Sequence, residues 1–211
     1  GYSLPVSDGS ERNRRNLRKA IALMQQAGYE IQDGVMQGAD GTPFAFELLL
    51  RKGSSENEII ADTFIQALAR IGVSAKVQIL DSAAYQERTN TYDFDMTHYE
   101  RGLSLSPGNE QYNYWGTAGV KTPGTRNWAG VNSAAAEAMI DAILTSETRD
   151  DFIAATRALD RVLTTGRYVI PFYQNTLSRL AHAKELHAPE RIPVYGDWIV
   201  WQSETWWMSD D

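Results

Sequence analysis

The sequence predicts an α/β fold in which a mixed sheet is flanked by helices. Residues 44–50 form an apolar run that is typical of a buried strand. A helical pattern follows from Ser54 to Gly72, and residues 73–79 then alternate apolar with polar side chains. A strand, a helix and a second strand in this order predict a βαβ unit with parallel strands and a right-handed crossover.

Shorter signals place the elements before this unit. Apolar residues at helical spacing predict a helix over 17–27, and Gly28 fits the position just past its end. The Asp-Gly pairs at 33–34 and 40–41 predict a small hairpin or two turns.

A second helix–strand passage follows the βαβ unit and ends in a long loop. A cap at 81–82 begins a short helix, which leads to a strand over 93–99. The loop over 99–115 is rich in Tyr, Ser, Asn and Glu, and a Pro-Gly pair at 107–108 marks a turn in it. A polar, aromatic loop at the end of a strand predicts a ligand-facing surface; the alternative is a solvated connection.

The carboxyl-terminal half predicts two helices and then two strands. Helical stripes cover 132–143 and 152–166. Residues 168–173 and 177–181 are interpreted as strands, and Pro171 places the first of them near a sheet edge or a bulge.

The regular pattern ends at Glu185, and tryptophans are concentrated after it. The domain prediction is therefore an α/β lobe over 1–184 and a Trp-rich tail over 185–211. We interpret the tail as a surface that docks on something outside this chain.

Composition and charge exclude several classes of site. The 211 residues carry a net charge of −7, which argues against a nucleic acid as the main partner, because phosphate binding needs a basic face. The absence of cysteine excludes disulfides, Cys-ligated zinc and thiol catalysis. The first residues lack the apolar core of a signal peptide, so we expect either a cytoplasmic protein or a mature or truncated piece.

Catalytic and metal-binding motifs are absent from the sequence. His182 and His187 lack metal-ligand spacing, and no phosphate-binding glycine loop or nucleophile elbow occurs. Asp93 and Asp95 share a strand face, but we interpret them as a charge at the strand start and a second carboxylate that faces a cleft, rather than as a metal or acid–base pair. The arginine run over 12–18 is interpreted as a solvated helix face.

Several strings resemble the second lobe of the extracellular solute-binding proteins of family 5, which serve ABC importers of peptides. They follow one another through almost the whole chain: LPVSDGS (4–10), LRKAIALMQQAGY (17–29), GTPFAFELLL (41–50), IQALARIGV (65–73), DFDM (93–96), SPGNEQ (106–111), YWG (114–116), RNWAG (126–130), ATRALDRVL (155–163), IPFY (170–173) and TWW (205–207). The strings at 106–111 and 158–163 are similar to the Yej-type branch, which is associated with oligopeptide and microcin C uptake.

This resemblance implies the carboxyl-terminal lobe of a two-lobed periplasmic-binding-protein (class II) fold. It implies an exported, periplasmic parent protein whose first lobe and signal peptide precede residue 1, and a tail that returns to that first lobe. The implied partners are a peptide or peptide-like ligand, the permease subunits of an ABC importer and the missing lobe; no cofactor, metal or catalytic residue is implied. Many members hold the peptide's amino terminus with an aspartate in the loop, but residues 103–106 are Leu-Ser-Leu-Ser here, so that role is not assigned.

On this reading the loop over 99–115 and the turn over 126–128 form one wall of a ligand cleft that closes by hinge motion. We expect Arg101 to pair with a carboxylate, or Glu100 with an amine, and the polar and aromatic side chains to hydrogen-bond or stack. The predicted ligand-binding residues are Tyr99, Glu100, Arg101, Ser104, Asn109, Tyr112, Trp115, Asn127 and Trp128.

Two alternative hypotheses belong to other functional classes. One is a carbohydrate-active hydrolase that uses Glu100 and Glu110 as acid and nucleophile, which depends on a carboxylate separation that the sequence does not give. The other is a protein-interaction module that docks through the Trp-rich tail.

Overall fold

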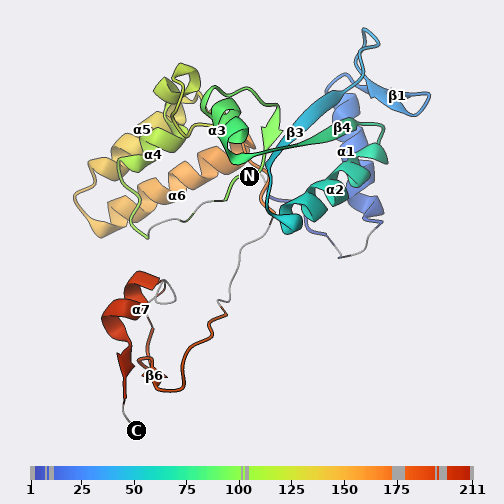
Figure 1. The fold of residues 1–211 in the computed structure, drawn as a ribbon. Helices are drawn as coiled ribbons and strands as arrows, with labels where there is room; N and C mark the ends of the chain where they lie inside the picture. Colours follow the sequence, from blue (N-terminus) through green and yellow to red (C-terminus); the bar gives the residue numbers. More distant parts are fainter. Residues whose placement is uncertain are drawn as a thin grey trace. The chain divides into compact units, whose positions relative to one another are not determined.

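The computed structural model describes residues 3–7, 9, 12–100, 102, 105–172, 179–192, 194 and 199–209 (Figure 1). The chain divides into two compact units, Gly1–Val169 and Ile170–Asp211, and each is described by itself. None of the described helices is both long and apolar enough to cross a membrane.

The centre of the first unit is a three-stranded sheet in the order β4-β3-β5, built from β3 (Ala45–Arg51), β4 (Ser74–Leu80) and β5 (Met96–Thr97). All of its strands are parallel, which confirms the predicted βαβ unit. Within the described residues the strands of this sheet are all parallel, and the antiparallel pairs lie in separate two-stranded sheets.

The strand predicted over 93–99 forms only at Met96–Thr97. One step before this pair, the carboxylate of Asp95 accepts the Glu47 N–H at 2.9 Å. The Glu47 N–H is therefore bonded to a side chain and does not bond to the backbone of β5, as it would if the pairing of β3 with β5 were longer. Asp93 is held in turn by Arg88, whose Nε lies 2.9 Å from its carboxylate.

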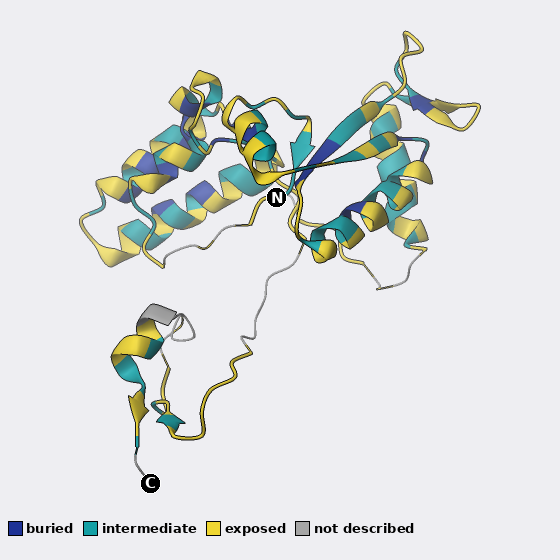
Figure 2. Ribbon diagram, viewed as in Figure 1, coloured by how far each residue is buried: buried dark blue, intermediate teal, exposed yellow. Residues whose placement is uncertain are grey.

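The two faces of the sheet are covered by different helices. On one face, Leu48 and Leu50 pack with Ala61 of α2 (Ser55–Ala69). Apolar side chains of α1 (Arg14–Gln26) pack on the same face, against the cluster around Met36. Residues of the opposite pleat contact α3 (Ser82–Asn90), where Arg88 lies 2.9 Å from Glu47 Oε1. Figure 2 shows that the buried part of β3 lies between these layers.

Most predicted helix starts are confirmed by their caps. Ser54 accepts the Asn57 N–H, Asp81 accepts two N–H groups of α3, and Ser133 accepts the Ala136 N–H. A side chain at each of these positions therefore satisfies backbone donors that the first helical turn leaves unpaired.

The predicted hairpin is formed by β1 (Glu30–Gln32) and β2 (Val35–Gln37), and the turn between them includes Asp33 and Gly34. It is joined to the end of α2 by a hydrogen bond from the Met36 N–H to the Gly72 carbonyl at 2.8 Å. The Met36 side chain is fully buried in the cluster that α1 covers.

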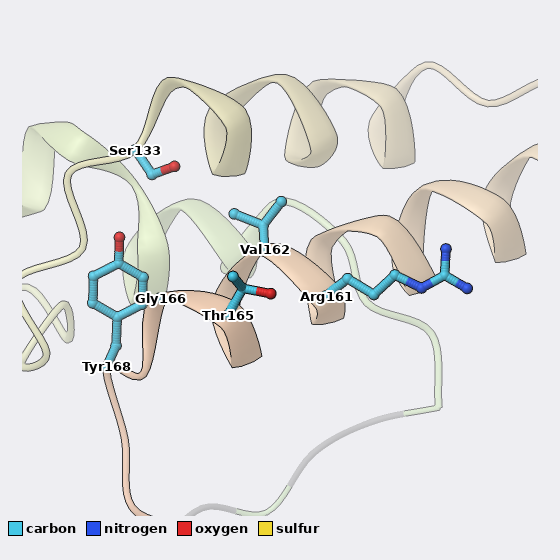
Figure 3. A pocket seen from close by; sticks show the side chains of 6 residues that line it. All are labelled: Ser133, Arg161, Val162, Thr165, Gly166 and Tyr168. Carbon is cyan, nitrogen blue, oxygen red and sulfur yellow. The ribbon is translucent and has the colours of Figure 1, made fainter. Parts of the chain in front are cut away.

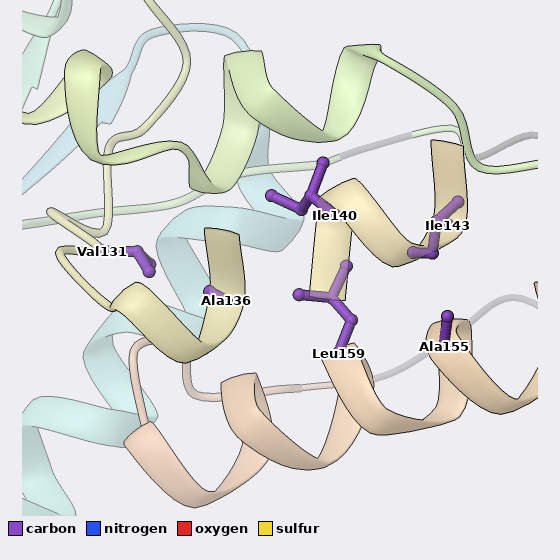
Figure 4. Packing of buried hydrophobic residues seen from close by; sticks show 6 residues of the cluster. All are labelled: Val131, Ala136, Ile140, Ile143, Ala155 and Leu159. Atoms are coloured by element: carbon purple, nitrogen blue, oxygen red, sulfur yellow. The ribbon is translucent and has the colours of Figure 1, made fainter. Parts of the chain in front are cut away.

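A helical layer follows the sheet: α4 (Glu110–Trp115), the 3₁₀ helix η1 (Thr117–Lys121), α5 (Ala134–Leu144) and α6 (Arg149–Gly166). Figure 4 shows apolar side chains of α5 and α6 facing one another around Ile140 and Leu159. The two helices predicted over 132–143 and 152–166 are confirmed.

The two strands predicted beyond α6 are wrong where the structure describes them. Residues 168–172 and 179–181 have no regular secondary structure, and 173–178 lie outside the described residues. Pro171 supplies no backbone N–H to a ladder, and Val169 and Ile170 are 58% and 54% exposed instead of packed.

The tail contains more regular structure than its sequence predicts. Leu186–His187 (β6) pairs antiparallel with Trp207–Met208 (β7), and α7 (Ile199–Thr205) precedes β7. The His187 ring stacks on Trp207, with centroids 6.0 Å apart. The boundary between the compact units lies at 169–170, whereas the sequence pattern ends at 184–185.

Candidate functional site

Four aromatic side chains meet on the α3 side of the sheet, and we call them the aromatic cluster: Tyr85, Phe94, Tyr99 and Trp128. The Trp128 ring makes edge-on contacts with all three others, at centroid distances of 6.5 Å to Tyr85, 6.1 Å to Phe94 and 4.8 Å to Tyr99. Tyr99, which follows β5, is 41% exposed. Tyr99 therefore lies at the carboxyl end of a parallel strand, where open α/β sheets bind their ligands, whereas Phe94 precedes that strand.

Tyr85 attaches the cluster to the sheet. Its hydroxyl donates to the His98 carbonyl at 3.1 Å and lies 3.0 Å from Thr97 Oγ1. Thr97 Oγ1 in turn donates to the Leu49 carbonyl of β3 at 2.9 Å. Burial raises the pKa of Tyr85, so its phenol remains a neutral hydrogen-bond donor near pH 7.

The positively charged side chain of Arg126 lies near the aromatic cluster. Arg126 Nη1 donates to the Tyr114 hydroxyl at 3.3 Å, and the guanidinium carbon lies 6.0 Å from the Tyr114 ring centroid. The hydrogen bond to Tyr114, followed by the influence of Tyr99, raises the pKa of Arg126. Arg126 is exposed, and a guanidinium has five N–H donors, so it retains donors for a ligand.

The turn that carries Arg126 and Trp128 is tied to the end of α3 by Tyr92. The Tyr92 hydroxyl lies 2.9 Å from the Gly119 carbonyl and 3.0 Å from the Thr122 carbonyl, and it also contacts Thr125 Oγ1. Tyr92 has a φ of 59°, a left-handed conformation that is uncommon for a tyrosine. Its side chain thus links α3 to the loop behind the cluster.

Asn127 holds the same turn from inside. Its side chain is 1% exposed, and its Nδ2 donates to the carbonyls of Gly116 and Val131, both at 2.9 Å. Its Oδ1 accepts the Val131 N–H at 2.8 Å. Since all of these partners are backbone groups of this chain, Asn127 positions the turn, and the structure does not present it to a ligand as the sequence predicts.

We expect Asn127→Ala to lower the free energy of unfolding by about 2 kcal/mol, because three buried backbone groups lose their partners. Denaturant unfolding of the variant and the wild type measures this loss. Asn109→Ala is the matched control, because Asn109 is exposed and makes no side-chain capping bond. Equal losses in the two variants would contradict the role of Asn127.

The predicted residues of α4 lie mainly in the helical core. Tyr112 and Trp115 are three positions apart, and both pack against the cluster around Ile140. The Tyr112 hydroxyl donates to Asp141, a bond that raises the pKa of Tyr112 to about 12. Tyr114 projects from another side of α4 and reaches Arg126.

Sequence reasoning missed Tyr85, Phe94 and Tyr114 as members of this site. The helical spacing of Tyr112 and Trp115 is the signal that separates them from Tyr114, because residues three apart share one face of a helix. Among the other predicted residues, Glu100 and Asn109 are exposed. Arg101 and Ser104 lie outside the described residues.

Three of the carboxylates considered for catalysis, Glu110, Asp93 and Asp95, have partners within the chain. Glu110 accepts the Gly108 N–H through both of its oxygens, at 2.9 and 3.0 Å, and Gln111 donates to the same carboxylate. Asp93 pairs with Arg88, and Asp95 accepts the Glu47 N–H. Within the part of the chain that the structure describes, no group of three or more acidic or histidine side chains is arranged to hold a metal ion.

A shallow hollow of about 470 Å³ lies between the start of α5 and the end of α6 (Figure 3). It is lined by Ser133, Arg161, Val162, Thr165, Gly166 and Tyr168. It shares no residue with the aromatic cluster.

Comparison with known proteins connects this fold to one family. Residues 2–122 match the family model described as bacterial extracellular solute-binding proteins, family 5 Middle. The oligopeptide-binding protein AppA of Bacillus subtilis, solved with a nonapeptide, superposes with a TM-score of 0.69 at 21% identity, over 92% of this chain and 37% of AppA. That likeness shows a shared fold.

Curated relatives match over nearly the whole chain. A putative binding protein of Brucella suis is 40% identical over 97% of this chain and 32% of its own length. In Agrobacterium fabrum, the peptidoglycan-binding protein YepA is 36% identical over 98% of this chain and 32% of its length, and the probable peptide-binding protein YejA is 36% identical over 99% and 33%. The chain thus spans about a third of the length of these relatives, and it belongs to the bacterial extracellular solute-binding proteins of family 5.

Proposed function

We propose that this chain is the carboxyl-terminal lobe of a two-lobed binding protein, and that the whole protein binds oligopeptides or peptide-like compounds between its lobes. The family match supports this proposal, as does a relative described as a probable peptide-binding protein. The observation that carries it in the structure is the aromatic cluster, which places an exposed tyrosine and a half-buried tryptophan beside the free donors of Arg126.

The chemistry of this surface fits a peptide. Tyr99 and Trp128 offer apolar ring faces and edges to side chains or to the backbone, and neither carries a charge. Arg126 offers a planar fork of N–H groups, which is the geometry that a carboxylate accepts. A mostly apolar surface with a few fixed polar groups is the usual lining of a small-ligand site.

Arg126 is our candidate for the ligand's carboxylate, and Glu100 for its amine. Residues 103–106 offer no aspartate for the amine. Glu100 is exposed at the start of the same loop. Glu100 belongs to the loop over 99–115 and Arg126 to the turn over 126–128, and these two segments form the predicted wall of the cleft.

In the proposed function the protein binds its ligand and performs no covalent chemistry. The hydrolase alternative loses support because both Glu110 oxygens accept the Gly108 N–H. We propose that the protein is exported to the periplasm, that it delivers its ligand to the permease subunits of an ABC importer, and that residues 185–211 return to the missing first lobe. The net charge of −7 argues against a nucleic acid as a partner.

We expect Arg126→Gln in the full-length protein to weaken binding of a peptide with a free carboxyl terminus by about tenfold, the loss typical of one charge-assisted hydrogen bond. The probe is the peptide that co-purifies with the protein, synthesised with a free and with an amidated terminus. Calorimetric titration measures both affinities.

The amidated peptide is the control for this test. Its affinity is expected to be low and to change little on substitution, because it lacks the charge that Arg126 would pair. Equal losses for both peptides would exclude Arg126 as the carboxylate partner. If no peptide co-purifies or binds, the proposed ligand class itself fails.

A further inference from the structure

The outer face of α1 carries a concentration of positive charge that the fold does not explain. Arg12, Arg14, Arg15, Arg18 and Lys19 are five of the 20 basic residues, and no acidic residue lies among them in the sequence. All five are exposed. Arg12 lies just before the cap of α1 and the other four lie in the helix, and we call the whole set the basic face of α1. It occurs in a chain whose net charge is −7.

The basic face is not neutralised within the described part of the chain. The ion pairs described there are both made by Arg88, and the first turn of α1 contains no acidic residue. The Arg18 Nε donates to the Arg14 backbone carbonyl at 3.4 Å, which leaves both charges uncompensated.

Its position on the helix makes the charge costly for folding. The amino terminus of a helix carries a partial positive charge, so cations in the first turn destabilise it. Asn13, at the cap position, makes no side-chain capping bond that would offset this. The fold uses the opposite side of α1, where Leu17, Ile21 and Met24 pack against the buried Met36 cluster. The basic face is therefore available for a partner.

The shape and chemistry of the basic face select the partner. Four of the cations are exposed on one helix and Arg12 lies just before its cap, and the exposed Leu23 lies one turn beyond Lys19. A cluster of four to eight basic residues on an amphipathic helix is the pattern that binds anionic lipid headgroups. An arginine fork also matches phosphate geometry.

We propose that the basic face of α1 docks this lobe on an anionic phospholipid surface. The phosphates of the headgroups pair with the arginines, and Leu23 approaches the boundary between headgroups and acyl chains. The acidic remainder of the chain is repelled by the same surface, so contact is restricted to the orientation that turns α1 toward the lipid. The inference goes beyond the proposed peptide binding and does not depend on the ligand.

The test compares flotation of the full-length protein with phosphatidylglycerol–phosphatidylcholine vesicles and with pure phosphatidylcholine vesicles at low salt. We expect binding only to the anionic vesicles. Arg14→Gln combined with Arg18→Gln is expected to reduce partitioning by about 25-fold, because each cation near an anionic surface contributes roughly a factor of five. The variant is expected to fold at least as well as the wild type, since it removes cations from the start of a helix.

Arg157→Gln combined with Arg161→Gln is the matched control, because these arginines have the same spacing and are also exposed, on α6. This control is expected to retain anionic-vesicle binding. The proposal is overturned if wild type binds both vesicle types equally or neither, or if both double variants lose binding equally. It is also overturned if soluble poly-glutamate binds the basic face as tightly as the vesicles do, which would indicate an acidic protein partner. Peptide affinity, measured on the same preparations, reports separately on the proposed function.

Discussion

Trp128→Ala is expected to weaken peptide binding by the full-length protein by about a hundredfold, an effect typical of a buried aromatic anchor at a binding surface. Trp128 is the ring that contacts Tyr85, Phe94 and Tyr99. Its removal takes away a ligand-facing surface and also releases the Tyr99 ring from its closest aromatic neighbour. Calorimetric titration with the co-purifying peptide measures the effect.

Trp115→Ala provides the contrast for this prediction. Trp115 packs against the helical core, so its truncation is expected to lower the unfolding temperature and to leave the peptide affinity of the folded protein nearly unchanged. The two tryptophans thus separate binding from packing. An affinity loss in Trp115→Ala as large as that in Trp128→Ala would contradict this assignment, and it would restore the role that the sequence predicts for Trp115.

Gly72→Ala is expected to produce the largest loss of stability, about 3 kcal/mol, because two costs combine. Gly72 has a φ of +78°, which an L side chain adopts with strain. A Cβ atom at this position would lie 2.6 Å from the Met36 backbone nitrogen and 2.8 Å from the Gly34 carbonyl oxygen. The Met36 nitrogen cannot move away freely, since its N–H is bonded to the Gly72 carbonyl. Thermal unfolding of variant and wild type measures the loss.

Gly28→Ala is the control that isolates the steric part. Gly28 also follows a helix and has a φ of +90°, but a Cβ there would meet no atom within 4 Å. Only the conformational cost remains, about 1 kcal/mol. If the two substitutions lowered the unfolding temperature equally, the close approach of the hairpin to Gly72 would not contribute to stability.

Local sequence signals were sufficient for the elements whose structure is decided within a short window. The alternation over 73–79 and the run over 44–50 predicted the parallel pair β3–β4, and Ser54 and Asp81 predicted the starts of α2 and α3. These signals depend on the pleat of a strand and on the unpaired donors of a helix, and both are properties of neighbouring residues.

Tertiary contacts decided what the sequence did not predict. The strand at 93–99 is reduced to two residues because Asp95 bonds to Glu47 across the sheet. Asn127 was predicted to face the ligand, but its amide is bonded to backbone that a turn brings around it. The residues that meet Trp128 come from α3 and from either side of β5. A pattern within a short stretch of sequence does not predict contacts between residues that are far apart in the chain.

In our proposal the aromatic cluster faces a peptide in the full-length protein. Replacing Tyr99 with a photo-crosslinking amino acid, and irradiating the protein with the co-purifying peptide, tests this contact. A second protein carries the same amino acid at Tyr168, in the hollow between α5 and α6. We predict crosslinked peptide at position 99 and none at position 168. Absence of crosslinking at 99, or equal crosslinking at both positions, would contradict the claim.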